Sequence, residues 1–231
     1  MMIPLIGMSK NGVGNDSHTK SLLHMDGANN STIFIDSAAG ASHTWTAKGN
    51  VVITTSQYKF GDASCYPNAN PANYILGDTD WNYSINTQDF TFDCWIYPTS
   101  GVGGIGDCIG PTYRFNFFFR NDAHYDVSFY YTPGDIGFQA GDGTHLTANN
   151  WHHVAVVKFS RDTPTLKLYV DGKFCAATYL YHAMDTFPNM GAKLIIGEWL
   201  NTYSVPYIDE YRITVGLARW TKNFTPPNRE Y

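Results

Sequence analysis

The 231-residue chain has few charged residues and no long apolar run. Only 15% of its residues are charged, and its formal net charge is −5. This negative balance argues against nucleic acid or an anionic membrane as a partner. No run of 18 apolar residues occurs, so we expect no membrane span. The apolar start at residues 1–8 is short and lacks a basic region, so no signal peptide is predicted.

Cysteine is also scarce, and its spacing is uninformative. The four cysteines are Cys65, Cys94, Cys108 and Cys175. They form no Cys-x-x-Cys pair and no metal-like cluster. Cys94 alternates with Phe90, Phe92 and Ile96, which indicates a small apolar side chain on a buried strand face. We therefore predict free thiols.

Catalytic motifs are missing as well. The chain contains no Gly-x-Ser-x-Gly elbow and no His-Glu-x-x-His site. Its three glutamates are Glu198, Glu210 and Glu230. Asp209 and Glu210 are adjacent on a predicted strand, so they project to opposite faces and cannot act as a pair. We predict that the protein is not an enzyme, although a pair of aspartates brought together by the fold stays open as an alternative.

What the sequence does contain is a series of short apolar or alternating runs separated by Gly, Asn, Asp and Pro. Such runs predict strands. They cover residues 32–36, 51–55, 113–119, 127–131, 151–159, 165–170, 173–179 and 193–198. Asp171-Gly172 lies between two of them and predicts a two-residue hairpin turn. No sustained helical period occurs, so we expect an all-β, antiparallel β-sandwich.

The first 20 residues differ from the rest. Residues 9–17 are polar, rich in glycine and without period, and such a segment buries too little surface to fold alone. We interpret residues 1–20 as an extended N-terminal arm, either a floppy terminus or a docking segment. Residues 21–231 are expected to form one domain, long enough to bury about 70% of its unfolded surface.

Several sequence blocks, taken in order, resemble a known family. The ending is the most informative: Tyr207-Ile208-Asp209-Glu210-Tyr211-Arg212-Ile213, Gly216-Leu217-Ala218-Arg219-Trp220 and Asn223-Phe224-Thr225-Pro226-Pro227. Earlier blocks are residues 22–27, 59–64, 89–98, 151–157 and 166–172. Together they resemble the laminin-G-like, concanavalin A-like jelly-roll domains common in bacteriophage structural proteins. Residues 101–143 depart most from the pattern, being longer and rich in Phe and Tyr.

The resemblance implies a non-enzymatic virion protein, made in the host cytoplasm. We expect a capsid decoration or tail accessory protein that contacts other virion proteins through the N-terminal arm and forms a homo-oligomer. Its lectin-like fold would bind host-surface glycans. A stand-alone carbohydrate-binding module is the alternative. A glycoside hydrolase or lyase is less favoured, because the Glu-x-Asp-x-x-Glu strand of the glucanase members is missing.

A candidate glycan site follows from strand alternation. In residues 89–97 the even positions are apolar, so Thr91, Asp93, Trp95 and Tyr97 point to the other face. A polar and aromatic stripe suits sugars, because rings stack on C–H faces and carboxylates accept hydroxyl protons. The candidate residues are Asp93, Trp95, Tyr130, Tyr131, Trp199 and Tyr203. The alternative is that a further loop covers this face and Trp95 belongs to the core.

A structural calcium ion is the one cofactor that the resemblance suggests. Sandwiches of this type bring their first and last strands together, which would place Asp26 near Asp209, with Asp36 as a further ligand. Calcium favours several carboxylate and carbonyl oxygens. The alternative is that Asp26-Gly27 is only a turn and that Asp209 accepts backbone amides.

Overall fold

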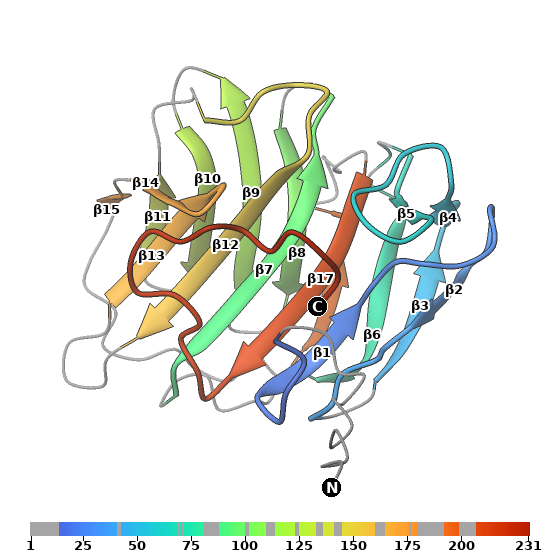
Figure 1. The fold of residues 1–231 in the computed structure, drawn as a ribbon, viewed down its shortest axis with the longest axis horizontal. Coiled ribbons are helices and arrows are strands. Elements are labelled where there is room, and N and C mark those ends of the chain that lie inside the picture. Colours follow the sequence, from blue (N-terminus) through green and yellow to red (C-terminus); the bar gives the residue numbers. More distant parts are fainter. Residues whose placement is uncertain are drawn as a thin grey trace, which may run out of the picture.

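The chain folds into two packed antiparallel sheets (Figure 1). This computed structural model describes residues 14–40, 43–68, 70, 72–80, 88–99, 102–109, 114–122, 125–132, 136–140, 145–159, 165–175, 177–179, 192–198 and 207–231. These residues contain no helix, so none in this part of the chain is long and apolar enough to cross a membrane. The predicted all-β, antiparallel sandwich is confirmed.

The first sheet has eight strands in the order β14-β13-β12-β7-β17-β5-β4, with β1 also paired to β17. Its strands are β1 (Thr19–Leu23), β4 (Val52–Thr54), β5 (Ser64–Tyr66), β7 (Phe90–Tyr97), β12 (His152–Phe159), β13 (Thr165–Val170), β14 (Lys173–Cys175) and β17 (Tyr207–Val215). The first and last strands of the described chain therefore lie side by side, as the resemblance implied.

The second sheet has nine strands in the order β15-β11-β10-β9-β8-β16-β6-β3-β2. Its strands are β2 (Ile33–Ile35), β3 (Thr44–Lys48), β6 (Tyr74–Asp80), β8 (Val102–Ile109), β9 (Arg114–Asp122), β10 (Tyr125–Thr132), β11 (Ile136–Ala140), β15 (Ala177–Tyr179) and β16 (Lys193–Ile196). The aromatic-rich stretch 101–143 supplies the four neighbouring strands β8 to β11. It is thus built of long strands of this sheet.

Strand alternation fills the space between the sheets with apolar side chains. On β7 the residues Phe90, Phe92, Cys94 and Ile96 are all buried in the core, as their spacing predicted. Phe115, Phe117 and Phe119 of β9 meet them from the second sheet. Burial of each such side chain contributes roughly 1.5–3 kcal/mol, so this layer is the main source of stability.

Two local predictions fare differently. The Asp171-Gly172 hairpin is confirmed, because both residues have positive φ, 49° and 72°, as a two-residue turn of this kind requires. The single strand predicted over residues 173–179 is wrong. β14 pairs in the first sheet and β15 in the second, so the chain passes from one layer to the other within this stretch.

The N-terminal boundary is also earlier than the predicted residue 21. β1 begins at Thr19 and pairs with β17. Asn15 exchanges two hydrogen bonds with the residue 37–39 loop, and the Asp16 carboxylate lies 3.2 Å from the Arg219 guanidinium. Residues 14–20 are therefore attached to the sandwich. Residues 1–13 of the predicted arm lie outside the described residues.

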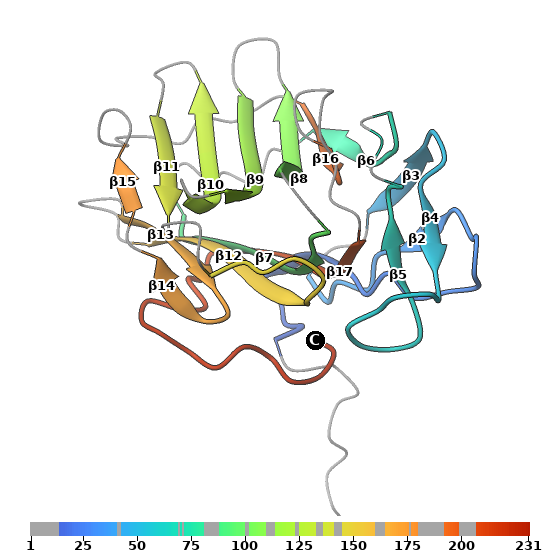
Figure 2. The same ribbon diagram turned by 90° about the horizontal axis from the view of Figure 1, so that it is seen from above.

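The C-terminal segment, residues 217–231, covers the outer face of the first sheet. Figure 2 shows it on the side of β12 and β7 that faces away from the second sheet. Its Trp220 and Phe224 rings stack with centroids 4.0 Å apart, and the edge of His153 packs against both. The Arg219 amide donates to the Thr91 hydroxyl. The alternative that a further loop covers this face is thus correct for much of the sheet.

A buried charged network lies beneath this segment. Asp93 on β7 accepts hydrogen bonds from Nε and Nη2 of Arg212 on β17, at 3.1 and 2.9 Å. The hydroxyl of Tyr231 also donates to Asp93, and the guanidinium lies 3.5 Å from the Tyr231 ring centroid. Burial alone would raise the pKa of Asp93, but Arg212 and His153 outweigh it and hold that pKa well below its usual range.

We predict that Asp93→Asn lowers the free energy of unfolding by about 3–5 kcal/mol, because it leaves the Arg212 charge buried without a counterion. Urea denaturation followed by tryptophan fluorescence measures the change. Asp62→Asn, at an exposed aspartate, is the control and should stay within about 0.5 kcal/mol of the unchanged protein. Equal stabilities of the two variants would contradict a central role for the pair.

The same pair predicts a pH dependence. The pKa of Asp93 is lower in the folded chain than in the unfolded chain, where it is about 3.9. The contribution of this carboxylate to stability is therefore complete above about pH 5, and it is lost as the pH falls toward the folded-state pKa. The difference in unfolding free energy between the protein and Asp93→Asn should shrink between about pH 5 and pH 2. A difference that stays constant over this range would show that the carboxylate does not carry it.

Candidate functional site

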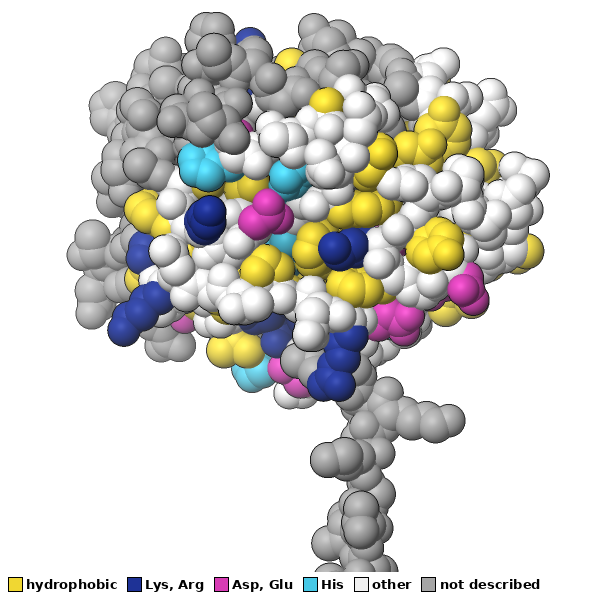
Figure 3. All heavy atoms as spheres, turned by 45° about the horizontal axis from the view of Figure 1, so that its top comes forward, with side chains coloured by type: hydrophobic (Ala, Val, Ile, Leu, Met, Phe, Trp, Pro, Cys, Tyr) yellow, Lys and Arg dark blue, Asp and Glu magenta, His cyan; other side chains and the backbone are white. Residues whose placement is uncertain are grey.

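A shallow pocket of about 470 Å³ opens on the outer face of the first sheet, at the edge of the C-terminal segment. Five separate parts of the chain form its walls. They supply Lys59, Phe60, Trp95, Trp151, Asp171, Pro226, Pro227 and Asn228. We name it the Trp95 pocket. In the oblique view of Figure 3, hydrophobic side chains reach the surface near the centre of the molecule beside single cationic and acidic side chains.

Trp95 lies on β7 and points away from the core, as its odd position predicted. Its ring packs against the edge of Phe60 at a centroid distance of 5.7 Å, and the Lys59 ammonium lies 4.0 Å from its centroid. The side chain is 5% exposed. Trp95 is therefore nearly enclosed by pocket residues, and a cation covers its face.

A buried aspartate holds the Lys59–Phe60 wall. One oxygen of Asp209 accepts the amides of both residues, at 2.7 and 3.1 Å, and the other accepts the Glu210 amide at 2.8 Å. Burial raises the pKa of Asp209 well above its usual value, although the two amides oppose the shift. Asp209 thus positions the loop that carries the cation of the pocket.

The polar side of the pocket comes from the β13–β14 hairpin. Asp171 in the turn contacts Nδ1 of His152 at 2.7 Å and accepts the His153 amide at 3.0 Å. Burial alone would raise the pKa of Asp171, but these bonds lower it below the usual value. Its side chain remains 40% exposed. The Asp171 carboxyl group is therefore ionised at neutral pH and presents a hydrogen-bond acceptor to the pocket.

Gly172 lets the C-terminal segment approach this hairpin. Its carbonyl accepts the Phe224 amide at 2.9 Å, and a Cβ on Gly172 would lie 2.0 Å from the Phe224 oxygen. Such a Cβ would also lie 3.1 Å from Pro226. The absence of a side chain here is what allows Pro226 and the residues after it to form a wall of the pocket.

A row of half-buried rings continues from the pocket across the same face. Trp151 contacts Tyr97 at a centroid distance of 5.5 Å, and Tyr97 contacts Tyr207 on β17 at 5.6 Å. Tyr207 then stacks on Tyr66 of β5 at 5.0 Å. All four side chains are partly exposed. We name Trp151, Tyr97, Tyr207 and Tyr66 the aromatic row.

The indole N–H groups of Trp95 and Trp151 are both buried, and neither has a hydrogen-bond partner among the residues that the structure describes. A buried donor without a partner costs about 1–3 kcal/mol, so native structures rarely retain one without a reason. At an open pocket, an acceptor from outside the chain, water included, can complete such donors.

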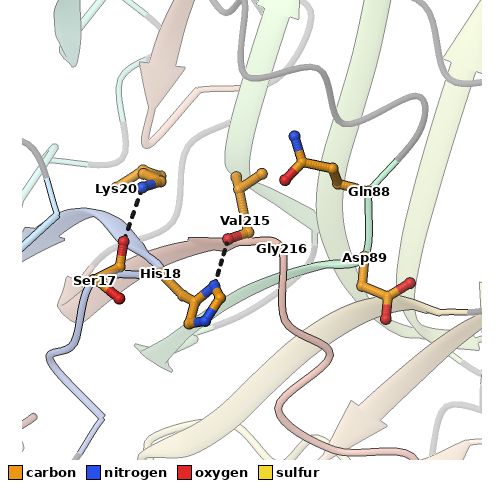
Figure 4. A pocket seen from close by; sticks show the side chains of 7 residues that line it. All are labelled: Ser17, His18, Lys20, Gln88, Asp89, Val215 and Gly216. Atoms are coloured by element: carbon orange, nitrogen blue, oxygen red, sulfur yellow. Dashed lines mark hydrogen bonds between the residues drawn. The ribbon is translucent and has the colours of Figure 1, made fainter.

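A second pocket, of about 370 Å³, lies at the end of β17, between the start of β1 and the residues that lead into β7 (Figure 4). Its polar groups largely bond to one another: His18 Nδ1 contacts the Val215 carbonyl at 3.2 Å, and Lys20 donates to the Ser17 carbonyl at 2.8 Å. The Gln88 and Asp89 side chains point away from each other in Figure 4. With no aromatic wall, this pocket is a poorer candidate for a ligand site.

The predicted glycan residues do not form one site. Trp95 lines a pocket, but Asp93 is 1% exposed and bonded to Arg212, so it is wrong as a solvent-side ligand. Tyr130 follows the core residue Phe129 on β10, so it lies on the outer face of the opposite sheet. The side chain of Tyr131, and Trp199 and Tyr203 altogether, lie outside the described residues.

The three predicted calcium ligands do not converge either. Among described residues, the one group of three potential ligands within 4.8 Å does not include them. Asp26 accepts the amides of Asp62 and Ala63, Asp209 accepts those named above, and Asp36 accepts the Leu22 amide and the Trp45 indole. The alternative that Asp209 accepts backbone amides is confirmed, and calcium binding by these residues stays a prediction.

The pocket residues that sequence reasoning missed are Lys59, Phe60, Trp151, Asp171 and Pro226 to Asn228. All except Asn228 lie in a block that the resemblance had identified, but none carries a local signal for binding. Only the strand register brings them together: β12 and β17 flank β7, with His153 and Asp209 opposite Trp95.

The fold and the exposed aromatic pocket together define a jelly-roll domain with the features of a binding surface. A family model described as the concanavalin A-like lectin/glucanases superfamily matches residues 68–215. The chain belongs to this superfamily. A search of curated proteins found no relative by sequence.

Solved structures with this fold include several toxin and enzyme domains. The chain resembles a botulinum neurotoxin DC binding domain in complex with SialylT, at 13% identity and TM-score 0.58, covering 87% of this chain and 48% of that one. It also resembles domain 4 of an extracellular arabinanase from Geobacillus stearothermophilus in complex with arabinotriose, at 15% identity and TM-score 0.54, covering 87% and 93%.

The binding domain of Paraclostridial Mosquitocidal Protein 1 is a third, at 16% identity and TM-score 0.57, covering 87% and 49%. The chain thus spans about half the length of the toxin binding domains it matches. At such low identities these likenesses show the fold.

We predict that Gly172→Ala displaces the C-terminal segment, since the new Cβ would overlap the Phe224 carbonyl at a strained positive φ. Trypsin should then cleave faster at Arg219 and Lys222. Gly27→Ala is the control, because Gly27 also has positive φ but its Cβ would meet nothing closer than 3.9 Å. Equal cleavage rates in the two variants would show that the segment does not depend on Gly172.

Proposed function

We propose that this protein is a non-enzymatic glycan-binding module and that the Trp95 pocket with the aromatic row is its binding surface. The observation that carries the proposal is the pair of unpartnered indole donors, Trp95 and Trp151, at one open aromatic pocket. Sugars offer the complementary chemistry, because their C–H faces stack on rings while their hydroxyls accept and donate hydrogen bonds. The arabinanase domain solved with arabinotriose supports the choice of ligand class.

In the proposed complex a sugar ring lies against Trp151 and takes the place of the Lys59 side chain over Trp95. Lys59 and the indoles then donate to sugar oxygens, and the Asp171 carboxylate accepts from a hydroxyl. Because the aromatic row extends over β7, β17 and β5, neighbouring sugars would contact Tyr97 and Tyr207 in turn. This favours an oligosaccharide over a single sugar.

The composition of the pocket supports binding without turnover. Hydrolysis of a glycosidic bond needs two carboxyl groups flanking that bond, roughly 5–10 Å apart. Asp171 is the one carboxylate among the residues that line the pocket, and it is engaged by His152. Asp93, which comes from the same face, is bonded to Arg212 beneath the C-terminal segment.

A virion role stays a prediction. The resemblance to bacteriophage structural domains favours a capsid decoration or tail accessory protein that presents the Trp95 pocket to host-surface glycans. Attachment to other virion proteins through the N-terminal arm, predicted as residues 1–20, and assembly as a homo-oligomer belong to the same prediction. None of these proposals is needed for the pocket to bind a sugar.

We predict that Trp151→Ala weakens glycan binding at least about tenfold, equivalent to about 1.4 kcal/mol, by removing a stacking wall. A glycan array with neutral and acidic oligosaccharides identifies the tightest ligand, and titration calorimetry then measures its affinity. Tyr58→Ala is the matched control, since Tyr58 is a 45% exposed aromatic residue beside the pocket loop that does not line the pocket. Binding of no array member, or equal affinities in the two variants, would contradict the proposal.

A further inference from the structure

Three potential metal ligands of different chemistry meet where the two sheets face each other. They are Asp126 on β10, His145 ahead of β12, and Cys175 at the end of β14. One ligand atom from each lies within 4.8 Å of the other two, the one such group of three among the residues that the structure describes. Because β10 and β14 belong to different sheets, the group spans the two layers.

The carboxylate is already oriented toward the imidazole. Asp126 is fully buried, and its Oδ1 accepts the amides of His145 and Leu146, each at 2.9 Å. Its Oδ2 lies 2.7 Å from Nδ1 of His145. The two amides fix the carboxylate through one oxygen and leave the other directed at the group. Hydrogen bonds of this kind orient the carboxylate ligands of metal sites.

The Cys175 thiol supplies a sulfur ligand, and the His145 imidazole lies on the side from which an ion can enter. Cys175 is 1% exposed, and its thiol makes a long contact of 3.7 Å with the Lys173 carbonyl. The His145 side chain is 33% exposed, so an ion can reach the group from solvent on that side. A buried thiol and a partly exposed imidazole next to a fixed carboxylate are the components of a transition-metal site rather than of a calcium site.

We propose that Asp126, His145 and Cys175 bind a zinc ion. Zinc accepts sulfur, nitrogen and oxygen ligands at about 2.0–2.3 Å in a tetrahedral arrangement, which places ligands roughly 3.4–3.8 Å apart. The ion would take the place of the present 2.7 Å contact between Asp126 Oδ2 and His145 Nδ1 and would draw in the Cys175 thiol, which lies within 4.8 Å of the other ligand atoms. On binding, the Cys175 thiol releases its proton to solvent and binds as thiolate, His145 binds as neutral imidazole, and a water molecule completes the tetrahedron.

The proposed ion would cross-link elements of both sheets. It would connect β10 of the second sheet, β14 of the first sheet and the segment that leads into β12. Since the group forms only in the folded chain, zinc would bind the native state alone and raise the melting temperature with its concentration. This inference is independent of the proposed glycan site.

Cobalt(II) provides the direct test, because thiolate coordination gives an intense charge-transfer absorption in the near ultraviolet. The full chain, reduced and freed of metal, should develop this band to one equivalent of cobalt and lose it when zinc is added. Cys175→Ala should abolish the band. Cys94→Ala is the matched control, a buried thiol on β7 outside the group, and should keep it.

His145→Ala is a second variant that leaves the thiol in place. Because it also removes the 2.7 Å partner of the buried Asp126 carboxylate, its melting temperature in chelator is measured to check that the chain still folds. This variant should weaken zinc binding at least about 100-fold, more than the loss of an outer-shell partner. The proposal is overturned if the protein gives no thiolate band, if Cys175→Ala keeps the band, or if His145→Ala binds zinc as tightly as the unchanged chain.

Discussion

The buried ion pair between Asp93 and Arg212 is the interaction on which the outer face of the first sheet depends. It joins the two central strands β7 and β17, and through it the hydroxyl and ring of Tyr231 are held against the sheet. Arg212 also donates to the Gly14 carbonyl, so the start of the described chain meets the same charge. A buried pair of this kind adds little net stability, but loss of one partner is costly. Its effect is to fix which segments lie on this face.

The Trp95 pocket follows from that constraint. The C-terminal segment covers Asp93 and His153, and its residues Pro226 to Asn228 form one wall of the opening at Trp95. Asp209, next in register on β17, holds the opposite wall through the amides of Lys59 and Phe60. Two aspartates on one face thus have structural roles, and they create a binding surface without contacting a ligand themselves.

The fold was predictable from the sequence because its signals are local. The alternation along Phe90 to Ile96 and the Asp171-Gly172 turn each depend on neighbours within a few residues.

The site was predictable only in part. Alternation placed Asp93 and Trp95 on the same face, but what covers that face is decided by a segment more than 120 residues later. The partners of Asp26, Asp36 and Asp209 were not predictable for a similar reason: aspartates also accept loop amides, and a sequence does not show which amides come near. Asp126, His145 and Cys175 likewise meet only through the packing of two sheets.

We propose that sugars bind at the Trp95 pocket, where the indole N–H groups of Trp95 and Trp151 have no acceptor among the described residues. The most direct measurement is nuclear magnetic resonance of the six tryptophan indole N–H signals during titration with the tightest oligosaccharide of the panel. The account predicts that the Trp95 and Trp151 signals shift together and saturably, while the Trp45 signal, whose indole donates to Asp36 on the far side, stays in place. Shifts elsewhere with these two signals unchanged, or no shift with any oligosaccharide, would contradict it.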